Sequence, residues 1–388
     1  MKTCLLVCLS LTASALAAEP PLPKFRAQDI DTAVNIGYGI AIADVDGDGK
    51  PDIILADKNT IQWYQNPTWK KHVIAENLTV ADNVCIAAQD IDGDGKCEVA
   101  VGAGWNPGET TDPTKSGAVF YLVAPADRTQ KWTAIPLHHE PTVHRMHWVK
   151  APAGQWELIV KPLHGRGNKA NAGDGSKVFA YTKPADPKTP WKTSLVSDFT
   201  HASHNFHPIN WDADPEHELV TGAKEGVFWF GRSTGEWKKK QISDQWTGEV
   251  RDGKLPNGTR FLATIEPMHG TTSALYTQPA GKGLWPRLVL DDSLKDGHAV
   301  AVNDFLGVGS DQIAVGWRGM TPKAVPGVRL LTPLDKEGKT WRKTDLSGAE
   351  VAIEDMKSAD LNGDGKPDLI LAGRATKNLR VLWNETGK

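Results

Sequence analysis

The feature that most constrains this chain is an acidic, glycine-rich segment that recurs between two strand-like runs. Three copies align directly: IAIADVDGDGKPDIILAD from Ile40, CIAAQDIDGDGKCEVAVGAG from Cys85 and MKSADLNGDGKPDLILAG from Met356. In each copy an alternating run precedes the acidic segment and a more apolar run follows it, which predicts a β-hairpin. Repetition of the hairpin predicts a repeat architecture rather than unrelated domains.

Weaker copies fill the rest of the chain. They are HRMHWVKAPAGQWELIVKPLHGRG from His144, HPINWDADPEHELVTGAK from His207, VRDGKLPNGTRFLATIEPMHG from Val250 and AVAVNDFLGVGSDQIAVGWR from Ala299. Each hairpin is followed by an aromatic strand, a tryptophan and a further apolar strand. We expect these tryptophans to pack between neighbouring units; they are Trp69, Trp132, Trp191, Trp237, Trp285 and Trp341.

Seven copies of roughly 40–60 residues predict an all-β, seven-bladed β-propeller that spans residues 19–388 as one domain. The last copy ends after its third strand, so residues 24–27 are expected to supply the fourth strand and close the ring. Residues 1–18 have the basic start, short apolar run and Ala15-Leu16-Ala17 ending of a signal peptide. The chain is therefore predicted to be secreted or periplasmic.

The acidic segments place oxygen-bearing side chains at positions 1, 3, 5 and 9 of a tight glycine turn. Such a donor set suits calcium, and without a cation these acids would repel one another. The predicted ligands are Asp44, Asp46, Asp48 and Asp52; Asp90, Asp92, Asp94 and Glu98; and Asp360, Asn362, Asp364 and Asp368. A fourth loop, with Asn210, Asp212, Asp214 and Glu218, is left open because Pro215 replaces a glycine.

These loops resemble the FG-GAP or VCBS repeats of integrin-type propellers, and the resemblance covers most of the mature chain. It implies the propeller fold with structural calcium, and it leaves function undetermined.

Blade topology predicts a site at the end of the channel opposite the acidic loops. Residues just before each first strand and just after each second strand should meet there, and they include many histidines and arginines. We predict a catalytic or metal-binding set of His144, His204, His207, His269, His298, Arg166 and Arg318. The predicted substrate-binding residues are Tyr38, Trp105, His164, Lys224 and Arg374.

The segments HRMHW, KPLHGRGN, HASHNFHPINWD, EPMHG and DGHAV resemble the propeller domain of the aldos-2-ulose dehydratase family. This resemblance implies a carbon–oxygen lyase, a dehydratase or β-eliminase, that acts on a keto-sugar or related carbohydrate. A second divalent metal (zinc, manganese or magnesium) at the histidines would fit such chemistry.

Two alternatives stay open: a non-catalytic, calcium-stabilised propeller that binds glycan or protein, and a uronate polysaccharide lyase. The net charge of −3 argues against a nucleic-acid partner, and no segment after the leader suits a membrane anchor. No G-x-S-x-G motif marks a serine hydrolase. A glycosidase would need facing carboxylates, and the acids expected at this end are only Asp82, Glu266, Asp296 and Asp355.

Overall fold

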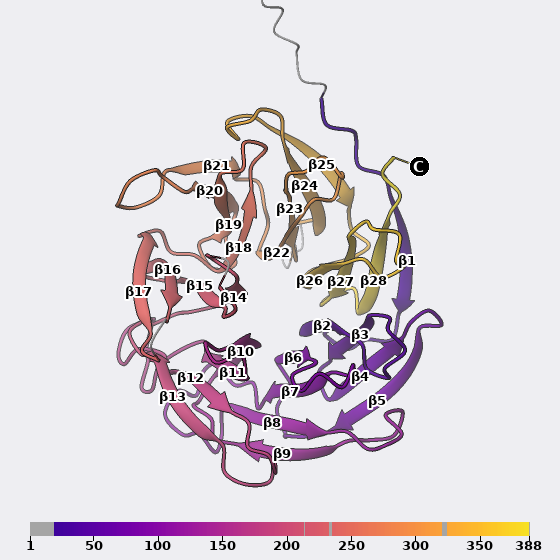
Figure 1. Cartoon of the computed structure of the whole chain (residues 1–388), viewed down its shortest axis with the longest axis vertical. Coiled ribbons are helices and arrows are strands. Elements are labelled where there is room, and N and C mark those ends of the chain that lie inside the picture. Colours follow the sequence, from indigo (N-terminus) through magenta and orange to yellow (C-terminus); the bar gives the residue numbers. More distant parts are fainter. Residues whose placement is uncertain (1–18, 213, 233–234, 320–323, 388) are drawn as a thin grey trace, which may run out of the picture.

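The computed structural model describes residues 19–212, 214–232, 235–319 and 324–387, so the predicted signal peptide lies outside the described residues. Twenty-eight strands form seven four-stranded antiparallel sheets around a central axis (Figure 1). The all-β, seven-bladed propeller predicted from the repeats is thereby confirmed. Within the described ranges, no helix is long and apolar enough to cross a membrane.

Each sheet runs from an innermost strand at the axis to an outermost strand at the rim. In that order, the first three sheets are β2 (Gly39–Ala43), β3 (Asp52–Ala56), β4 (Thr60–Gln65) and β5 (Lys70–Glu76); β6 (Cys85–Gln89), β7 (Glu98–Ala103), β8 (Ala118–Val123) and β9 (Thr133–Leu137); and β10 (Val143–Lys150), β11 (Trp156–Pro162), β12 (Val178–Thr182) and β13 (Lys192–Ser197). The next two are β14 (Phe206–Ile209), β15 (Glu218–Ala223), β16 (Gly226–Gly231) and β17 (Lys238–Ser243); and β18 (Glu249–Lys254), β19 (Arg260–Glu266), β20 (Thr272–Thr277) and β21 (Arg287–Asp291). The last two are β22 (Gly297–Asn303), β23 (Gln312–Trp317), β24 (Gly327–Pro333) and β25 (Trp341–Ser347); and β26 (Ile353–Ala359), β27 (Asp368–Gly373), β28 (Asn378–Asn384) and β1 (Phe25–Asp31).

The N-terminal strand β1 closes the ring, as predicted. It pairs antiparallel with β28, from Phe25 opposite Asn384 to Asp31 opposite Leu379. The last sheet therefore joins the two ends of the chain. This pairing gives the blade its fourth strand.

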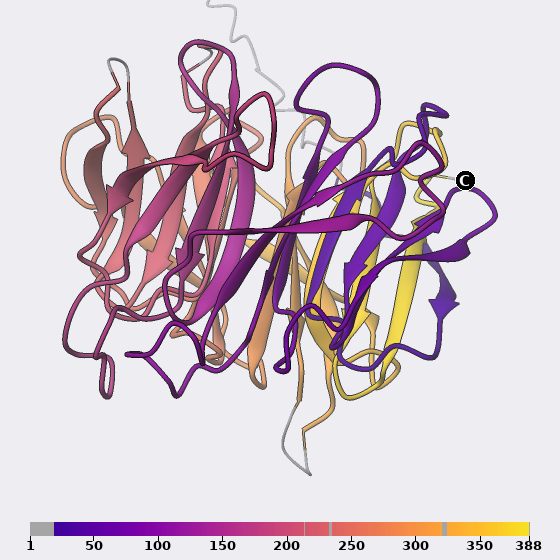
Figure 2. The same cartoon turned by 90° about the horizontal axis from the view of Figure 1, so that it is seen from below.

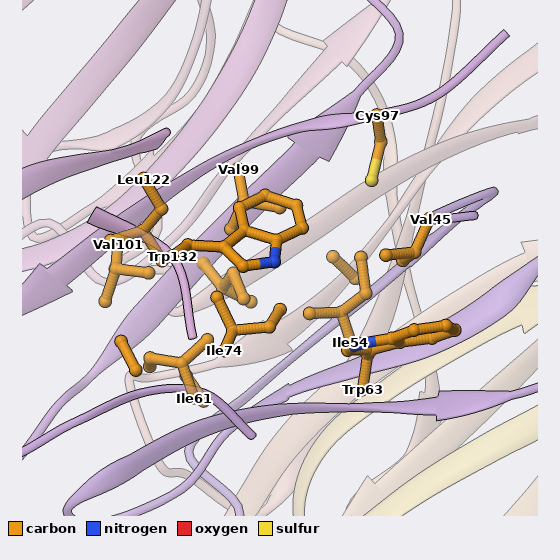
Figure 3. Close-up of a cluster of buried hydrophobic side chains, with 14 residues drawn as sticks. Val45, Ile54, Ile61, Trp63, Ile74, Cys97, Val99, Val101, Leu122 and Trp132 are labelled. Carbon is orange, nitrogen blue, oxygen red and sulfur yellow. The ribbon is translucent and has the colours of Figure 1, made fainter. Parts of the chain in front are cut away.

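The core lies between neighbouring sheets, and the tryptophan that follows the third strand in six of the blades helps to fill it. Trp132 of the second blade packs in one cluster with Trp63 and Ile74 of the first (Figure 3). Its backbone N–H also donates to the Ile74 carbonyl at 2.8 Å. Other members of the set pack likewise: Trp191 lies 5.2 Å from Tyr121, and Trp69 lies 6.0 Å from Trp383 of the last blade. The predicted packing role is confirmed for these residues.

Strand direction fixes which residues meet at each end of the channel. In the first blade, Ala43 pairs with Asp52 beside the acidic loop, while Gly39 pairs with Ala56 at the other end of the same hairpin. The strands run between two loop-bearing faces (Figure 2). We call the face with the acidic loops the acidic-loop end, and the opposite face, where innermost strands begin, the histidine end.

Candidate active site at the histidine end

Four histidines from four different blades lie against one another at the histidine end. His144 and His298 are the second residues of β10 and β22, His204 precedes β14 by two residues, and His269 follows β19 by three. Ring centroids are 4.6 Å apart for His144 and His204, 4.9 Å for His204 and His298, and 4.8 Å for His269 with both His204 and His298. We call these four residues the histidine cluster.

Three of these rings have the Nδ1 atom fixed by an acceptor. His204 Nδ1 lies 2.8 Å from Glu249 Oε1, His298 Nδ1 lies 2.5 Å from the Glu354 carbonyl, and His144 Nδ1 lies 2.8 Å from the His204 carbonyl. An acceptor-only partner places the proton on Nδ1 and leaves a lone pair on Nε2. Outer hydrogen bonds of this kind usually orient histidines that bind metals.

The donor set of the cluster fits a divalent metal. One ligand nitrogen each from His204, His269 and His298 lies within 4.8 Å of the others, and we call these three residues the histidine triad. The Nε2 atoms of His204 and His269 are 3.0 Å apart; ligand atoms of a tetrahedral zinc ion lie about 3.3 Å apart. Three neutral imidazoles suit zinc better than magnesium, which prefers oxygen ligands.

His269 differs from the other two triad residues in its outer contact. Its Nδ1 lies 3.3 Å from Arg318 Nη2, a donor, so the neutral ring carries its proton on Nε2, toward His204. Metal binding by His269 would therefore displace that proton and reorganise the contact with Arg318. His269 also has a positive φ of 57°, a conformation that is uncommon for a residue with a Cβ.

Burial keeps the cluster uncharged. His204 and His298 are 2% and 4% exposed. Burial is the main cause that lowers the pKa of both rings well below the ordinary value, and neighbouring Arg318 adds to the effect. For His269, burial and then the Arg318 charge lower the pKa to about 4. Neutral imidazole is the form that binds metals and accepts protons.

Two arginines lie beside the cluster, and both are paired with acids. Arg318 donates to Asp296 at 2.9 and 3.0 Å and to Glu354 at 3.0 Å, and Arg374 donates to Glu354 at 2.8 Å. The Arg374 guanidinium also lies 5.3 Å from the Tyr38 ring. The carboxylates offset much of the positive charge, so this flank is balanced rather than strongly cationic.

Aromatic side chains complete this side of the site. The Trp105 ring lies 5.0 Å from His144, and its backbone N–H donates to the Asp82 carbonyl at 3.0 Å. The Tyr38 hydroxyl donates to the Asp82 carboxylate at 2.9 Å. Of the twelve predicted catalytic and substrate-binding residues, eight thus form one connected group: His144, His204, His269, His298, Arg318, Arg374, Tyr38 and Trp105.

The other four predicted residues make their contacts elsewhere. His207 lies within β14 rather than before it, because this strand begins at Phe206, and its ring lines a cavity in the channel. Arg166 donates to Glu140 at 2.6 Å. His164 Nδ1 lies 3.0 Å from the His201 carbonyl, and Lys224 Nζ donates to the Asn171 carbonyl at 2.8 Å. Their position on the same face is therefore not sufficient for contact with the cluster.

The prediction that this end has few acids beyond Asp82, Glu266, Asp296 and Asp355 is wrong. Glu249, the first residue of β18, and Glu354, the second residue of β26, are buried there at 2% and 4% exposure. Glu266 instead accepts from Tyr276 and Arg287 within its own blade. The sequence rule selects residues at the start of each innermost strand. It would have selected both glutamates if the predicted starts of these two strands had been placed one residue earlier.

The three acidic loops have nearly the same geometry. Asp44 accepts from the N–H groups of Gly47 and Gly49, both at 2.7 Å, and these glycines have φ near +80°, which favours glycine. The buried Asp52 accepts from Val45 and Asn66 N–H groups, at 2.9 and 2.8 Å. Equivalent bonds form around Asp90 with Glu98 and around Asp360 with Asp368.

Carboxylates crowd these loops. Oxygen atoms of Asp44, Asp46 and Asp48 lie within 4.8 Å of one another, as do those of Asp90, Asp92 and Asp94, and those of Asp212, Asp214 and Glu218 in the loop left open. Burial raises the pKa of Asp52 and Glu98 to about 7 and that of Asp368 to about 6. An oxygen-only donor set of this kind fits calcium and would be relieved of repulsion by it.

Comparison with known proteins agrees with the repeat and the fold. The family model of the FG-GAP-like repeat matches residues 37–101. The chain carries an FG-GAP-like repeat. The matched segment begins just before β2 and ends within β7, so this repeat contains the first two acidic loops.

One relative shares most of the chain. Aldos-2-ulose dehydratase of Phanerodontia chrysosporium is 22% identical over 377 residues, which cover 88% of this chain and 40% of that protein. The chain thus spans less than half of the length of this relative. Identity at this level supports the propeller family, so the dehydratase activity enters below as a proposal.

Solved structures share the propeller shape. A chain in the crystal structure of the mitotic checkpoint complex superposes with a TM-score of 0.58 at 12% identity, covering 99% of this chain and 98% of that one. A chain in the structure of BBS1N in complex with ARL6DN gives 0.56 at 14% identity, covering 96% and 99%. Such low identities show the fold alone.

Proposed function

We propose that the protein is a carbon–oxygen lyase that eliminates water from a keto-sugar or a related carbohydrate, with a divalent metal held by the histidine triad. The observation that carries the proposal is the convergence of four histidines from four blades, three of them with Nδ1 fixed by an acceptor. The similarity to aldos-2-ulose dehydratase supports the same class of reaction.

A triad-bound divalent cation would act as a Lewis acid toward the substrate carbonyl oxygen and so acidify the neighbouring C–H group. His204, His269 and His298 would hold it, and Glu249 and the Glu354 carbonyl would keep two of these rings oriented. The metal would be zinc in preference to manganese or magnesium, since the protein donors at the triad are nitrogens.

His144 is the candidate base. Its Nδ1–H is held by the His204 carbonyl, so its Nε2 lone pair is available for a proton. We propose that Nε2 removes the proton beside the substrate carbonyl, that the C–H electron pair forms the new C=C bond, and that the β-hydroxyl leaves. The same His144 then returns its proton to the leaving oxygen, which departs as water, so atoms and charge balance.

The side chains of Tyr38, Trp105 and Arg374, beside the histidine cluster, would bind the sugar. Trp105, 5.0 Å from His144, offers an aromatic face of the kind that packs against a sugar ring, and Tyr38 and Arg374 offer polar groups beside it. Arg318 contacts both His269 and Glu354. From this position its guanidinium would stabilise the negative charge that develops on the substrate oxygen. A carbohydrate ligand, small or oligomeric, agrees with these groups.

The acidic loops are proposed to hold structural calcium away from the reaction. We also propose that the protein acts outside the cytoplasm, secreted or in the periplasm, on the basis of the leader-like first eighteen residues.

The test is an elimination assay. The zinc-loaded protein is incubated with a panel of keto-sugars and uronate oligosaccharides, and the unsaturated product is followed by its ultraviolet absorbance. Removal of the metal with a strong chelator should abolish the absorbance change, and zinc should restore it. Turnover of uronates alone would favour a uronate polysaccharide lyase. Tight binding of sugars without turnover of any substrate would overturn the lyase proposal in favour of a non-catalytic glycan-binding propeller.

A further inference from the structure

The axial channel contains a cavity of about 300 Å³ next to the histidine cluster, on the side of the acidic loops. Its walls come from six innermost strands or the residues beside them, and its polar lining includes Arg145, His147, His207, Arg251, Asp355 and Lys357. Arg145 and His147 follow His144 along β10, and His207 follows His204 into β14, so the cavity continues the channel beyond the cluster.

Cations outnumber acids in this cavity although the whole chain has a net charge of −3. Three lining residues carry a positive charge, and Asp355 is the one acid among the lining residues. Asp355 already accepts from the N–H groups of Ile40 and Met356, and from Lys357 Nζ at 3.2 Å. The Asp355 charge is therefore shared and offsets at most one of the three cations.

Arg145 has no compensating partner among the residues that the structure describes. Its side chain is 8% exposed, its Nε is buried without a hydrogen bond, and no hydrogen bond or ion pair joins its guanidinium to a described residue. Arg251, also 8% exposed, donates to the Val250 carbonyl at 2.7 Å and approaches Glu249 only to 3.8 Å. Buried charges are costly unless they are paired, so a guanidinium in this state indicates a ligand that supplies the missing negative charge.

We propose that this cavity is an anion-binding site for a tetrahedral oxyanion, a phosphate or sulfate group, either free or carried on a sugar. The donors surround the axis from β10, β14, β18 and β26 instead of forming one planar fork, which suits a tetrahedral group better than a carboxylate. The neutral rings of His147 and His207 can donate an N–H without adding charge. The proposal does not depend on lyase activity.

The size of the cavity sets the ligand class. About 300 Å³ is at the lower end of the range for small-molecule sites, so a monosaccharide phosphate or sulfate is the largest ligand expected. A free inorganic oxyanion would fit with accompanying water.

The experiment measures thermal midpoints and calorimetric binding of the full protein with sodium sulfate, inorganic phosphate, glucose 6-phosphate and glucuronate. Sodium chloride at matched ionic strength is the control. Sulfate and phosphate should raise the midpoint and bind with a measurable Kd, while glucuronate should bind more weakly. Tighter binding of glucose 6-phosphate than of phosphate would identify a sugar-borne group, and the reverse would identify the free ion.

The decisive variant is Arg145→Met, which removes the unpaired charge and keeps much of the side-chain volume. In anion-free buffer its midpoint should equal or exceed that of the wild type, and its sulfate Kd should weaken by about 10- to 100-fold, as for a lost charged hydrogen bond. Arg26→Met, on the outermost strand β1, loses a pair with Glu385 and a contact with the Trp383 ring, and it should keep the sulfate response.

Lys357→Met gives a second route to the same test, because this side chain is more exposed (27%) than that of Arg145 (8%) and also lines the cavity. An unchanged sulfate Kd in both Arg145→Met and Lys357→Met would overturn the proposal. So would the absence of any wild-type response beyond that to chloride.

Discussion

The two ends of the channel are built in opposite ways. At the acidic-loop end each loop is held by its own residues: Asp44 accepts from Gly47 and Gly49, three and five positions away. At the histidine end the key contacts span the sequence, as between His204 and Glu249, 45 residues apart, or Arg318 and Glu354, 36 apart. One end repeats a local motif, and the other assembles single residues from several blades.

The two ends also draw on different blades for their main residues. The first, second and last blades keep complete acidic loops, and these loops also place the buried Asp52, Glu98 and Asp368 between strands. Of the blades that supply the histidine cluster, the one with β14 keeps Asp212, Asp214 and Glu218, and the other three have lost most of those acids. The four histidines of the cluster therefore come from blades without a complete acidic loop, whereas Tyr38, Trp105 and Arg374 beside them come from the blades that have one.

The largest expected effect follows from removing a triad residue. His298→Ala should lower turnover of the keto-sugar by about 100-fold or more, because it removes a proposed metal ligand whose ring is held by the Glu354 carbonyl. His217→Ala is the matched control: His217 lies beside the acidic loops, near Trp156 and the Lys150 N–H, and its loss should leave turnover nearly unchanged. Similar losses of turnover in the two variants would contradict the view that only the histidine end takes part in the reaction.

The next effect tests whether Glu249 positions His204. Glu249→Gln keeps the size of the side chain but weakens its hydrogen bond to Nδ1, and outer partners of this kind change metal affinity by about 10- to 100-fold. The zinc Kd, measured by competition with a chromophoric chelator, should weaken by that factor. A zinc Kd equal to that of the wild type would show that Glu249 does not position His204 for metal binding.

Much of this architecture could be predicted from the sequence, for a physical reason. A loop such as Asp44 to Asp52 encodes its own turn, and apolar alternation encodes the strands on either side, so the blades and their closure by β1 were predictable from local patterns. The tryptophans between blades were predictable for the same reason.

The histidine end could be predicted only in part. His144, His204, His269 and His298 followed from topology, but Glu249 and Glu354 were missed because strand starts are uncertain by a residue or two. His207 was placed at the cluster although it lies in β14 and lines the cavity. Arg166 pairs with Glu140, a partner that only the folded chain reveals, since the two lie 26 residues apart.

Calcium removal should produce a moderate effect confined to stability. A ligand that binds only the folded state at 100 times its Kd adds about 2.7 kcal/mol per site to the free energy of unfolding. A calcium-selective chelator should therefore lower the thermal midpoint measurably, and Asp46→Asn or Asp92→Asn should reduce the drop. Turnover at a temperature well below the midpoint should stay near that of the wild type. A thermal midpoint that the chelator leaves unchanged would contradict the proposal that these loops bind calcium.

The smallest effect is expected at Arg166. Its guanidinium donates to Glu140, outside the histidine cluster, so Arg166→Ala should change kcat/KM by less than about threefold, within the range of surface substitutions. Arg318→Ala, which removes a contact to His269 and two acids, should cost far more. A large loss of kcat/KM in Arg166→Ala would show that the site extends beyond the histidine cluster to Arg166.

The central claim is that the two ends of the channel hold two different cations. The most direct test is metal analysis by mass spectrometry of protein equilibrated with calcium and zinc, comparing His204→Ala/His298→Ala with Asp46→Asn/Asp92→Asn. The histidine variant should lose about one zinc per chain and keep its calcium, and the aspartate variant should lose calcium and keep its zinc. Zinc that persists in the histidine variant, or loss of both metals from either variant while it stays folded, would contradict the account.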